Sequence, residues 1–371
     1  MSTSYYKLYK TEVDNDYFWI KNESSLPTEI ELYIIGDSSV YYNENVISCS
    51  KDKVNWENTR NTLGIRIELE PFQKLFLRSS GGFSKGENSY IMIIGSSIFS
   101  MGGPIASLID YTNMENVTSV PDWCFNNLCS RWTTFSDSLQ QKNLIDISQI
   151  DFGNITTIGE GSFYQAFYVT DYFGGFSYIK TLPDFSKITT IGRRGMYKMF
   201  QGTPTLTGKV DMSNLTSIEE EGLYGAFGYT KLTEAPDFSS LTTIGNGGLK
   251  FAFKYDYHMK GQPLMSNVTT IGNYGMDGCF SCNENLTKGA DLSSCTQIGS
   301  YALQQCYHQC FRLEEVTAPN IDSWYSYFFD SWLYRAGEFV TGTKTFNAPT
   351  GLEILTDTSS GIPSGWTRVD Y

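Results

Sequence analysis

The chain has 371 residues, 40% of them hydrophobic and 15% aromatic, which is enough for two or three domains with a substantial core. Its net charge of −13 argues against binding to a nucleic-acid backbone or to an anionic membrane surface, because a protein that binds either of them needs many Lys and Arg side chains. The sequence contains no apolar run of about 18 residues, so we expect no membrane span.

Residues 1–108 contain strand-like runs separated by turn residues and carry no repeat. The runs are YFWIKN, EIELYII, GIRIELEPFQKLFLRSS and SYIMIIGSS. Short strands separated by Gly, Asn and Ser predict a β-sandwich, which we interpret as a docking domain. The first residues lack the basic and apolar segments of a signal peptide, which predicts synthesis in a cytoplasm and cysteines that are free thiols.

A motif typified by TTIG recurs along residues 109–334 and predicts a solenoid. We call the isoleucine of this motif the anchor of each repeat. Successive anchors are 33, 27, 26, 27 and 27 residues apart. The anchors are Ile158, Ile191, Ile218, Ile244, Ile271 and Ile298. Degenerate copies anchored at Val120 and Trp324 bring the total to eight repeats.

Apolar residues occupy fixed columns relative to each anchor and predict the core. They lie six and three residues before the anchor and five, eight and nine residues after it (+5, +8 and +9), as in Met212, Leu215, Leu223, Ala226 and Phe227. The spacing of the last three predicts one or two helical turns after each anchor. A Gly after most anchors predicts a turn with positive φ, and small residues at +4 predict close approach of neighbouring coils.

Two other columns have structural and functional interpretations. Asn-x-Thr sequons at 116, 154, 214, 267 and 285 are predicted to be by-products of the repeat and not sugar acceptors. Aspartates seven residues before the anchors, at 151, 184, 211, 237 and 291, are predicted to cap turns, with calcium binding as the alternative.

The repeated pattern TTIG…G[ML]xxxF over residues 114–333 resembles the BspA-like leucine-rich repeats. The segment SCSKDKVNWENT is similar to the β-domain that precedes such repeats in proteins of gut bacteria and their phages. The last residues, 335–371, are similar to the C-terminal cap found there. The resemblance implies a mainly β protein with short helices: an N-terminal β-sandwich, a solenoid of about eight repeats and a small β cap.

The sequence offers little for catalysis or metal binding. Its two histidines, His258 and His308, belong to no recognisable triad, so we expect no enzyme, no cofactor and no catalytic residue. The best metal candidate is Cys279 and Cys282 with Cys306, His308 and Cys310, whose spacing suits zinc. Because Cys279 and Cys306 fall in the +8 core column, we predict buried, reduced, metal-free thiols instead.

Tyrosine-rich loops after the +9 column are the candidate binding site. Tyr contributes large contact area at low entropic cost, and its ring face can stack on sugar rings. The candidate residues are Tyr168, Tyr172, Phe173, Phe176, Tyr178, Tyr229, Tyr255, Tyr257 and His258. The alternative is that these aromatic side chains only cover the edges of the coils.

These features and the resemblance together indicate a non-enzymatic bacteriophage virion protein of the tail, fibre or capsid surface, made in the host cytoplasm. Residues 1–108 would contact other virion proteins or sister subunits, and the loops would contact a host-surface glycan or protein. The alternatives are a bacterial cell-surface adhesin and a cytoplasmic interaction scaffold.

Overall fold

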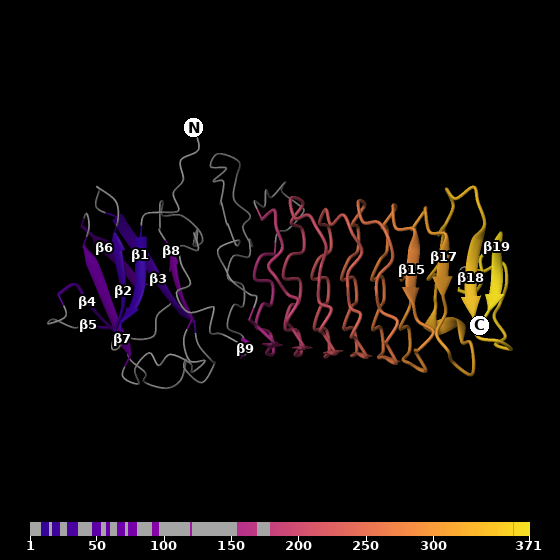
Figure 1. Cartoon of the computed structure of the whole chain (residues 1–371), viewed down its shortest axis with the longest axis horizontal. Helices are drawn as coiled ribbons and strands as arrows, with labels where there is room; N and C mark the ends of the chain where they lie inside the picture. Colours follow the sequence, from indigo (N-terminus) through magenta and orange to yellow (C-terminus); the bar gives the residue numbers. More distant parts are fainter. Residues whose placement is uncertain are drawn as a thin grey trace.

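A computed structural model describes most of the repeat region and the strands of the N-terminal region (Figure 1). The described residues are 9–14, 17–22, 28–35, 47–52, 57–59, 65–70, 73–79, 91–95, 119–120, 154–168 and 179–371 except Ser359. Several predicted core residues of the first two repeats lie outside these ranges, namely Met114, Val117, Phe125, Leu128, Cys129 and Phe152.

The N-terminal region contains two antiparallel sheets. The first has the order β1 (Tyr9–Asp14), β2 (Tyr17–Asn22), β7 (Lys74–Ser79), β4 (Ile47–Ser50), β5 (Glu57–Thr59). The second has the order β6 (Ile65–Leu69), β3 (Thr28–Ile35), β8 (Ile91–Gly95). The predicted run 64–80 divides into β6 and β7, which belong to different sheets. That the two sheets pack as a sandwich stays a prediction.

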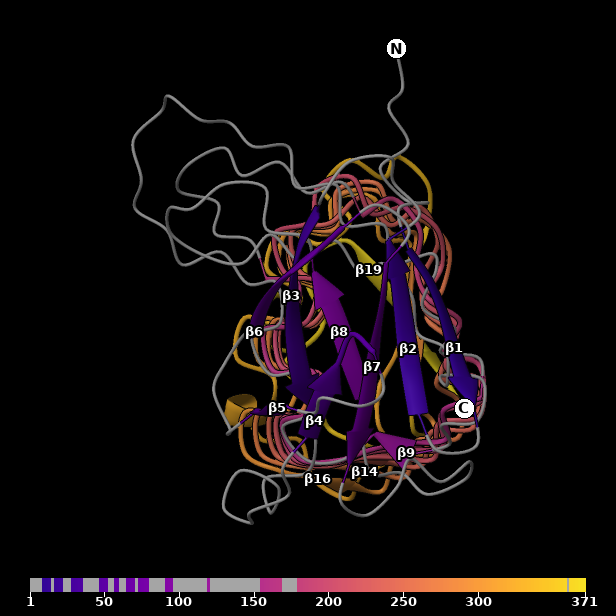
Figure 2. The same cartoon turned by 90° about the vertical axis from the view of Figure 1, so that its left-hand side faces the viewer.

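The anchors form one parallel sheet along the edge of the stack, seen end-on in Figure 2. Each strand has two residues: β9 (Ser119–Val120), β10 (Thr157–Ile158), β11 (Thr190–Ile191), β12 (Ser217–Ile218), β13 (Thr243–Ile244), β14 (Thr270–Ile271) and β16 (Gln297–Ile298). Each anchor pairs in register with the next, from Val120 to Ile298. The predicted repeat register is therefore confirmed at seven anchors.

The eighth anchor, Trp324, was placed wrongly in this sheet. Its indole stacks on Phe329 at 3.6 Å and donates a hydrogen bond to the carbonyl oxygen of Ser360 at 2.9 Å. The large ring thus packs against the last part of the chain and does not extend the row of strands. The coil after it keeps the register, because the Tyr307 amide donates to the Trp332 carbonyl at 2.8 Å.

The predicted short helices are absent from the described residues, whose one helical element is the 3₁₀ turn η6 (Ser326–Phe328). A ribbon of successive turns follows each anchor instead, and alternate amides leave it for the next coil. In the coil of Ile191, Tyr197 donates within the coil to Arg194, whereas Met196 donates to Gly222 of the next coil at 2.8 Å. A helix would need both amides for its own coil.

Positive φ recurs every four residues along this turn ribbon, at +3, +7 and +11. Non-glycine residues occupy many of these positions with φ between 51° and 64°, including Arg194, Lys198, Phe251 and Tyr274. This left-handed conformation is uncommon outside Gly and persists because the hydrogen bonds to the neighbouring coil fix it. The four-residue period also turns the +5, +8 and +9 side chains toward the core. The prediction that these columns are buried is therefore correct, although the predicted helical backbone is wrong.

The core is a continuous file of the predicted apolar columns. Neighbouring rings of the +9 column stack with centroids 5.3 to 5.8 Å apart and interplanar angles of 20° or less. The column consists of Phe167, Phe200, Phe227, Phe253, Phe280 and Tyr307. Every described residue of the five predicted core columns is buried except Ile321, which is partly buried. One hydrophobic core therefore runs through all the described coils.

The Gly after the anchor has a different role from the predicted one. Among the described glycines at this position, Gly192, Gly245, Gly272 and Gly299 do not have positive φ. A Cβ on Gly245 would lie 2.8 Å from the backbone carbon of Glu219 in the preceding coil. At +4, a Cβ on Gly222 would instead meet Ile218 Cγ2 of its own coil at 2.7 Å. The +1 position, more than +4, sets the approach of neighbouring coils.

On the side of the coils opposite the anchor strands, isolated β-bridges join neighbouring repeats. Toward the C-terminus, longer strands take the place of these bridges. A four-stranded parallel sheet there has the order β15 (Lys288–Asp291), β17 (Glu315–Thr317), β18 (Lys344–Ala348), β19 (Trp366–Asp370). The equivalent segments of earlier repeats contribute only isolated bridges, such as Asp211 with Asp237. The predicted cap, 335–371, contains β18 and β19, which continue the parallel ladder beyond the repeats.

Polar side chains of the other columns satisfy backbone groups. The aspartates cap turns as predicted: Ser213 and Ser239 donate their amides to Asp211 and Asp237 two residues earlier, at 3.1 and 3.2 Å. The sequon amides serve the repeat, since Asn214 and Asn267 donate to carbonyls of the preceding coil at 2.7 and 2.6 Å. Both columns therefore have structural roles.

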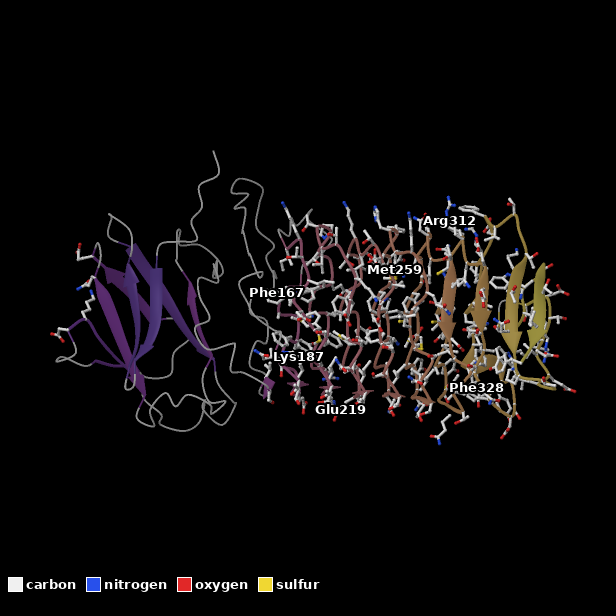
Figure 3. All side chains as sticks on the ribbon, viewed as in Figure 1. Phe167, Lys187, Glu219, Met259, Arg312 and Phe328 are labelled. Atoms are coloured by element: carbon white, nitrogen blue, oxygen red, sulfur yellow. The ribbon has the colours of Figure 1, made fainter. Side chains whose placement is uncertain are left out.

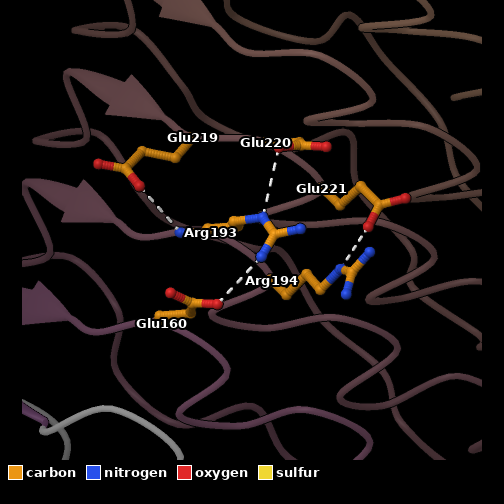
Figure 4. A network of polar contacts seen from close by, with 6 residues as sticks. All are labelled: Glu160, Arg193, Arg194, Glu219, Glu220 and Glu221. Atoms are coloured by element: carbon orange, nitrogen blue, oxygen red, sulfur yellow. Dashed lines mark hydrogen bonds and ion pairs between the residues drawn. The ribbon is translucent and has the colours of Figure 1, made fainter.

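Charged residues add links between coils where the Gly after the anchor is replaced by Glu219 (Figure 4). The Glu219 carboxylate accepts the Arg193 amide at 3.0 Å, and the Arg193 guanidinium contacts Glu160 and Glu220 at 3.2 and 3.3 Å. The Arg193 side chain is 43% exposed, so its ion pairs contribute at most about 1 kcal/mol each. The network joins three successive coils through Arg193.

Replacing Phe227 with Ala should lower the free energy of unfolding by about 3–5 kcal/mol, because it opens a cavity between two stacked rings. Urea denaturation of the full chain measures this. The control is Phe339→Ala, at a residue 58% exposed, which should change stability by less than about 1 kcal/mol. Equal losses in the two variants would contradict the ring stack.

Replacing Gly245 with Ala should cost about 1–3 kcal/mol, because the new methyl group meets the backbone of the preceding coil, which must move. Gly342→Ala is the matched control, since a Cβ at Gly342 meets nothing within 4 Å. Thermal unfolding compares the two. An unchanged melting temperature in Gly245→Ala would show that the preceding coil can accommodate a methyl group at this position.

Candidate functional site

Aromatic and lysine side chains of the turn ribbon form a continuous strip along the stack. Tyr164, Tyr197 and Tyr224, each six residues after its anchor, stack with centroids 4.7 Å apart. Phe251 continues this row at 5.7 Å from Tyr224, with its ring edge-on. We call the whole surface the aromatic–lysine strip: Tyr164, Tyr168, Tyr197, Lys198, Tyr224, Tyr229, Lys250, Phe251, Lys254, Tyr255, Tyr257 and Tyr274.

Three lysines join the rows of rings into this one surface. The Lys198 ammonium lies 5.5 to 5.8 Å from the ring centroids of Tyr168, Tyr197 and Tyr224. Lys250 lies over Phe251 and Tyr274, and Lys254 lies over Phe251 and Tyr255, all between 4.7 and 5.1 Å. Such contacts stabilise each ammonium by about 0.5–2 kcal/mol.

The structure brings together some of the predicted binding residues and not others. Tyr229, Tyr255 and Tyr257 form a cluster, with centroids 4.6 and 6.1 Å apart, and Tyr168 lies beside Lys198. His258 is exposed next to this cluster in sequence but makes no ring contact within the described part. Tyr172, Phe173, Phe176 and Tyr178 lie outside the described residues.

The prediction missed the rings on the ribbon itself. Tyr164, Tyr197 and Tyr224 recur at +6 in three successive repeats, and that recurrence in the aligned columns was the available signal. A second missed row lies at +3, where Tyr274 and Tyr301 stack at 5.1 Å and Tyr301 meets Tyr327 edge-on at 6.1 Å.

A buried polar group lies beneath the tyrosine cluster. Asp256 is fully buried, and its Oδ2 accepts hydrogen bonds from the Thr230 hydroxyl at 2.8 Å and the Leu232 amide at 3.0 Å. Its Oδ1 is buried without a hydrogen-bond partner. Burial raises the pKa of Asp256 to about 7, although hydrogen bonds to Thr230 and to backbone amides oppose the shift.

The neighbouring core supports this polar group. The Asp256 amide donates to Asn283 Oδ1 at 2.8 Å, and Asn283 contacts Met259 Sδ at 3.6 Å. In Figure 3, Met259 and Arg312 lie toward the edge opposite Glu219, where the loops follow the turn ribbon. Met259, two residues after Tyr257, and Glu219, directly after the strand β12, therefore lie toward different edges of the coils.

The cysteine candidates for zinc are core thiols. Cys279 and Cys306 are buried and free, and burial raises the pKa of both thiols well above the usual value. Cys310 donates to the Phe280 carbonyl at 3.1 Å. No group of three metal-ligating side chains occurs among the residues that the structure describes. That the protein carries no zinc stays a prediction.

The stacked coils, parallel ladders and repeated columns define a leucine-rich-repeat solenoid. Residues 195–333 match the model of the BspA type leucine rich repeat region, in six copies. Residues 195–333 therefore form BspA-like leucine-rich repeats, as the resemblance indicated. Comparison with curated proteins and with solved structures gave no match.

The match to these repeats indicates which classes of function fit the chain. Repeats of this kind are generally non-enzymatic, commonly mediate protein binding and fit a surface or adhesin-type protein. Within the described ranges, the chain has no helix long and apolar enough to cross a membrane. The aromatic–lysine strip is the described surface with the chemistry of a binding site.

Replacing Asp256 with Asn should remove a pH dependence of stability. A raised carboxyl pKa means that its contribution is complete below about pH 4 and is lost as the pH rises toward about 7. Between pH 5 and pH 8 the variant should therefore gain about 2–3 kcal/mol relative to wild type.

Denaturation of both proteins at several pH values measures this difference. Asp322→Asn, at an exposed residue, is the control and should show a constant difference from wild type. A constant difference for Asp256→Asn as well would mean that Asp256 is charged in the fold at neutral pH.

Proposed function

We propose that this chain is a non-enzymatic binding protein that presents the aromatic–lysine strip to a glycan on a host surface. The observation that carries the proposal is the continuity of the strip over successive coils, held by backbone hydrogen bonds between them. Such a surface is pre-organised, so little conformational entropy is lost when a ligand binds. Its phenol and ammonium groups supply donors for the oxygen atoms of a sugar.

The proposed setting is a bacteriophage virion, where the chain would be a tail, fibre or capsid-surface component. Residues 1–108 would dock on other virion proteins or on sister subunits, and residues 335–371 would cap the solenoid. Support comes from the N-terminal sheets, whose strands precede the repeats and pair only with one another among the described strands. The match to BspA-type repeats favours a second candidate, a bacterial cell-surface adhesin.

A glycan array tests the binding function with the labelled full-length protein. Wild type should bind a set of glycans, and the triple variant Tyr229→Ser, Tyr255→Ser, Tyr257→Ser should lose at least about tenfold in affinity, because several aromatic contacts disappear. The control variant Phe339→Ser, Leu355→Ser removes exposed apolar side chains elsewhere and should bind as wild type does. Equal binding by all three proteins would reject the strip as the site.

The setting is tested separately by cross-linking mass spectrometry of purified particles. We expect the chain among the virion proteins, with its cross-links to them concentrated in residues 1–108. Recovery in the bacterial envelope and not in particles would favour the adhesin. Cross-links concentrated in the repeats would assign docking to the solenoid.

A further inference from the structure

The exposed chemistry of the aromatic–lysine strip is that of a donor surface. The faces of Tyr164, Tyr197 and Tyr224 cover one another, with interplanar angles of 5° and 16°, so a ligand meets mainly their edges and hydroxyl groups. Aromatic edges carry partial positive charge, and burial raises the pKa of Tyr224, which keeps its hydroxyl protonated. These groups favour a ligand rich in acceptor atoms over a neutral sugar that stacks on ring faces.

Two of the strip's three lysines carry positive charge that no ion pair within the described residues neutralises. Lys250 pairs with Asp277 at 3.0 Å, and Arg194 beside the strip pairs with Glu221. In contrast, Lys198 and Lys254 form no ion pair with any residue in the described part of the chain. Lys198 is also half-buried among three rings. Within the described ranges these two cations lack an ion-pair partner, although the whole chain has a net charge of −13.

The spacing of the two cations suits a polymer with repeated charges. Lys198 belongs to the coil of Ile191 and Lys254 to the coil of Ile244, two coils further along the stack. At a strand spacing of ~4.8 Å, the two coils are roughly 10 Å apart. An extended polysaccharide that bears a carboxylate on each sugar can therefore reach both ammonium groups while its hydroxyls meet the tyrosines.

We propose that the aromatic–lysine strip binds an acidic polysaccharide, with carboxylates of the polymer at Lys198 and Lys254. This inference rests on the proposed glycan-binding function and narrows it to one class of ligand. The negative charge of the rest of the chain makes the strip selective, because a polyanion is repelled from other surfaces.

Titration calorimetry with the full-length protein tests the proposal, with polygalacturonate and its fully methyl-esterified form as probes. Wild type should bind polygalacturonate more tightly than the ester by about tenfold or more, and added salt should weaken the binding. Lys198→Met with Lys254→Met should lose about tenfold, whereas Lys198→Arg with Lys254→Arg should retain the binding. Lys187→Met with Lys260→Met removes the same charge outside the strip and should also retain it.

Three outcomes would overturn the proposal: equal affinity for the two polymers, no loss in the Met variant of the strip, or an equal loss in the control variant. Binding of a poly-glutamate peptide without binding of polygalacturonate would assign the strip to an acidic protein instead. Circular dichroism confirms that each variant is folded. If neutral glycans on the array depend on the tyrosine cluster while these tests fail, the proposed function stands and only the ligand class is wrong.

Discussion

The structure depends on one arrangement of hydrogen bonds, in which alternate amides of the turn ribbon leave their own coil for the next. These bonds fix the distance between coils, hold non-glycine residues at positive φ and leave no room for a side chain at Gly245. They also bring equivalent side chains within contact of one another. The phenylalanine stack inside and the tyrosine row outside are two results of the same spacing.

The sequence was sufficient to predict the register of the repeat and the core columns, because burial depends on which residues recur at equal positions. It could not identify the backbone after each anchor. A helix and a ribbon of four-residue turns both place +5, +8 and +9 on one side, and only the destination of amides such as that of Met196 distinguishes them. The role of the Gly after the anchor was missed for a related reason, since it concerns distance to another coil and not local conformation.

The surface proposed to bind a ligand was partly predictable. Loops were an obvious place to look, and Tyr229, Tyr255 and Tyr257 do form a cluster there. The row of Tyr164, Tyr197 and Tyr224 belongs to the repeat itself, so attention to variable segments passed over it. The mutual stacking of these rings could not be foreseen from composition, and it changes the expected ligand chemistry from ring faces to ring edges and hydroxyl groups.

The pairing of Ile158 with Ile191 has a wider meaning, because 33 residues separate them whereas most neighbouring anchors are separated by 26 or 27. The ladder therefore tolerates a change in the length of the connecting segment without a shift of register. Gain or loss of a whole repeat would likewise leave the core side chains of the other repeats facing inward and their surface side chains facing outward. Gene duplication can thus lengthen the outer surface by one row of side chains at a time, without any change to the residues of the core.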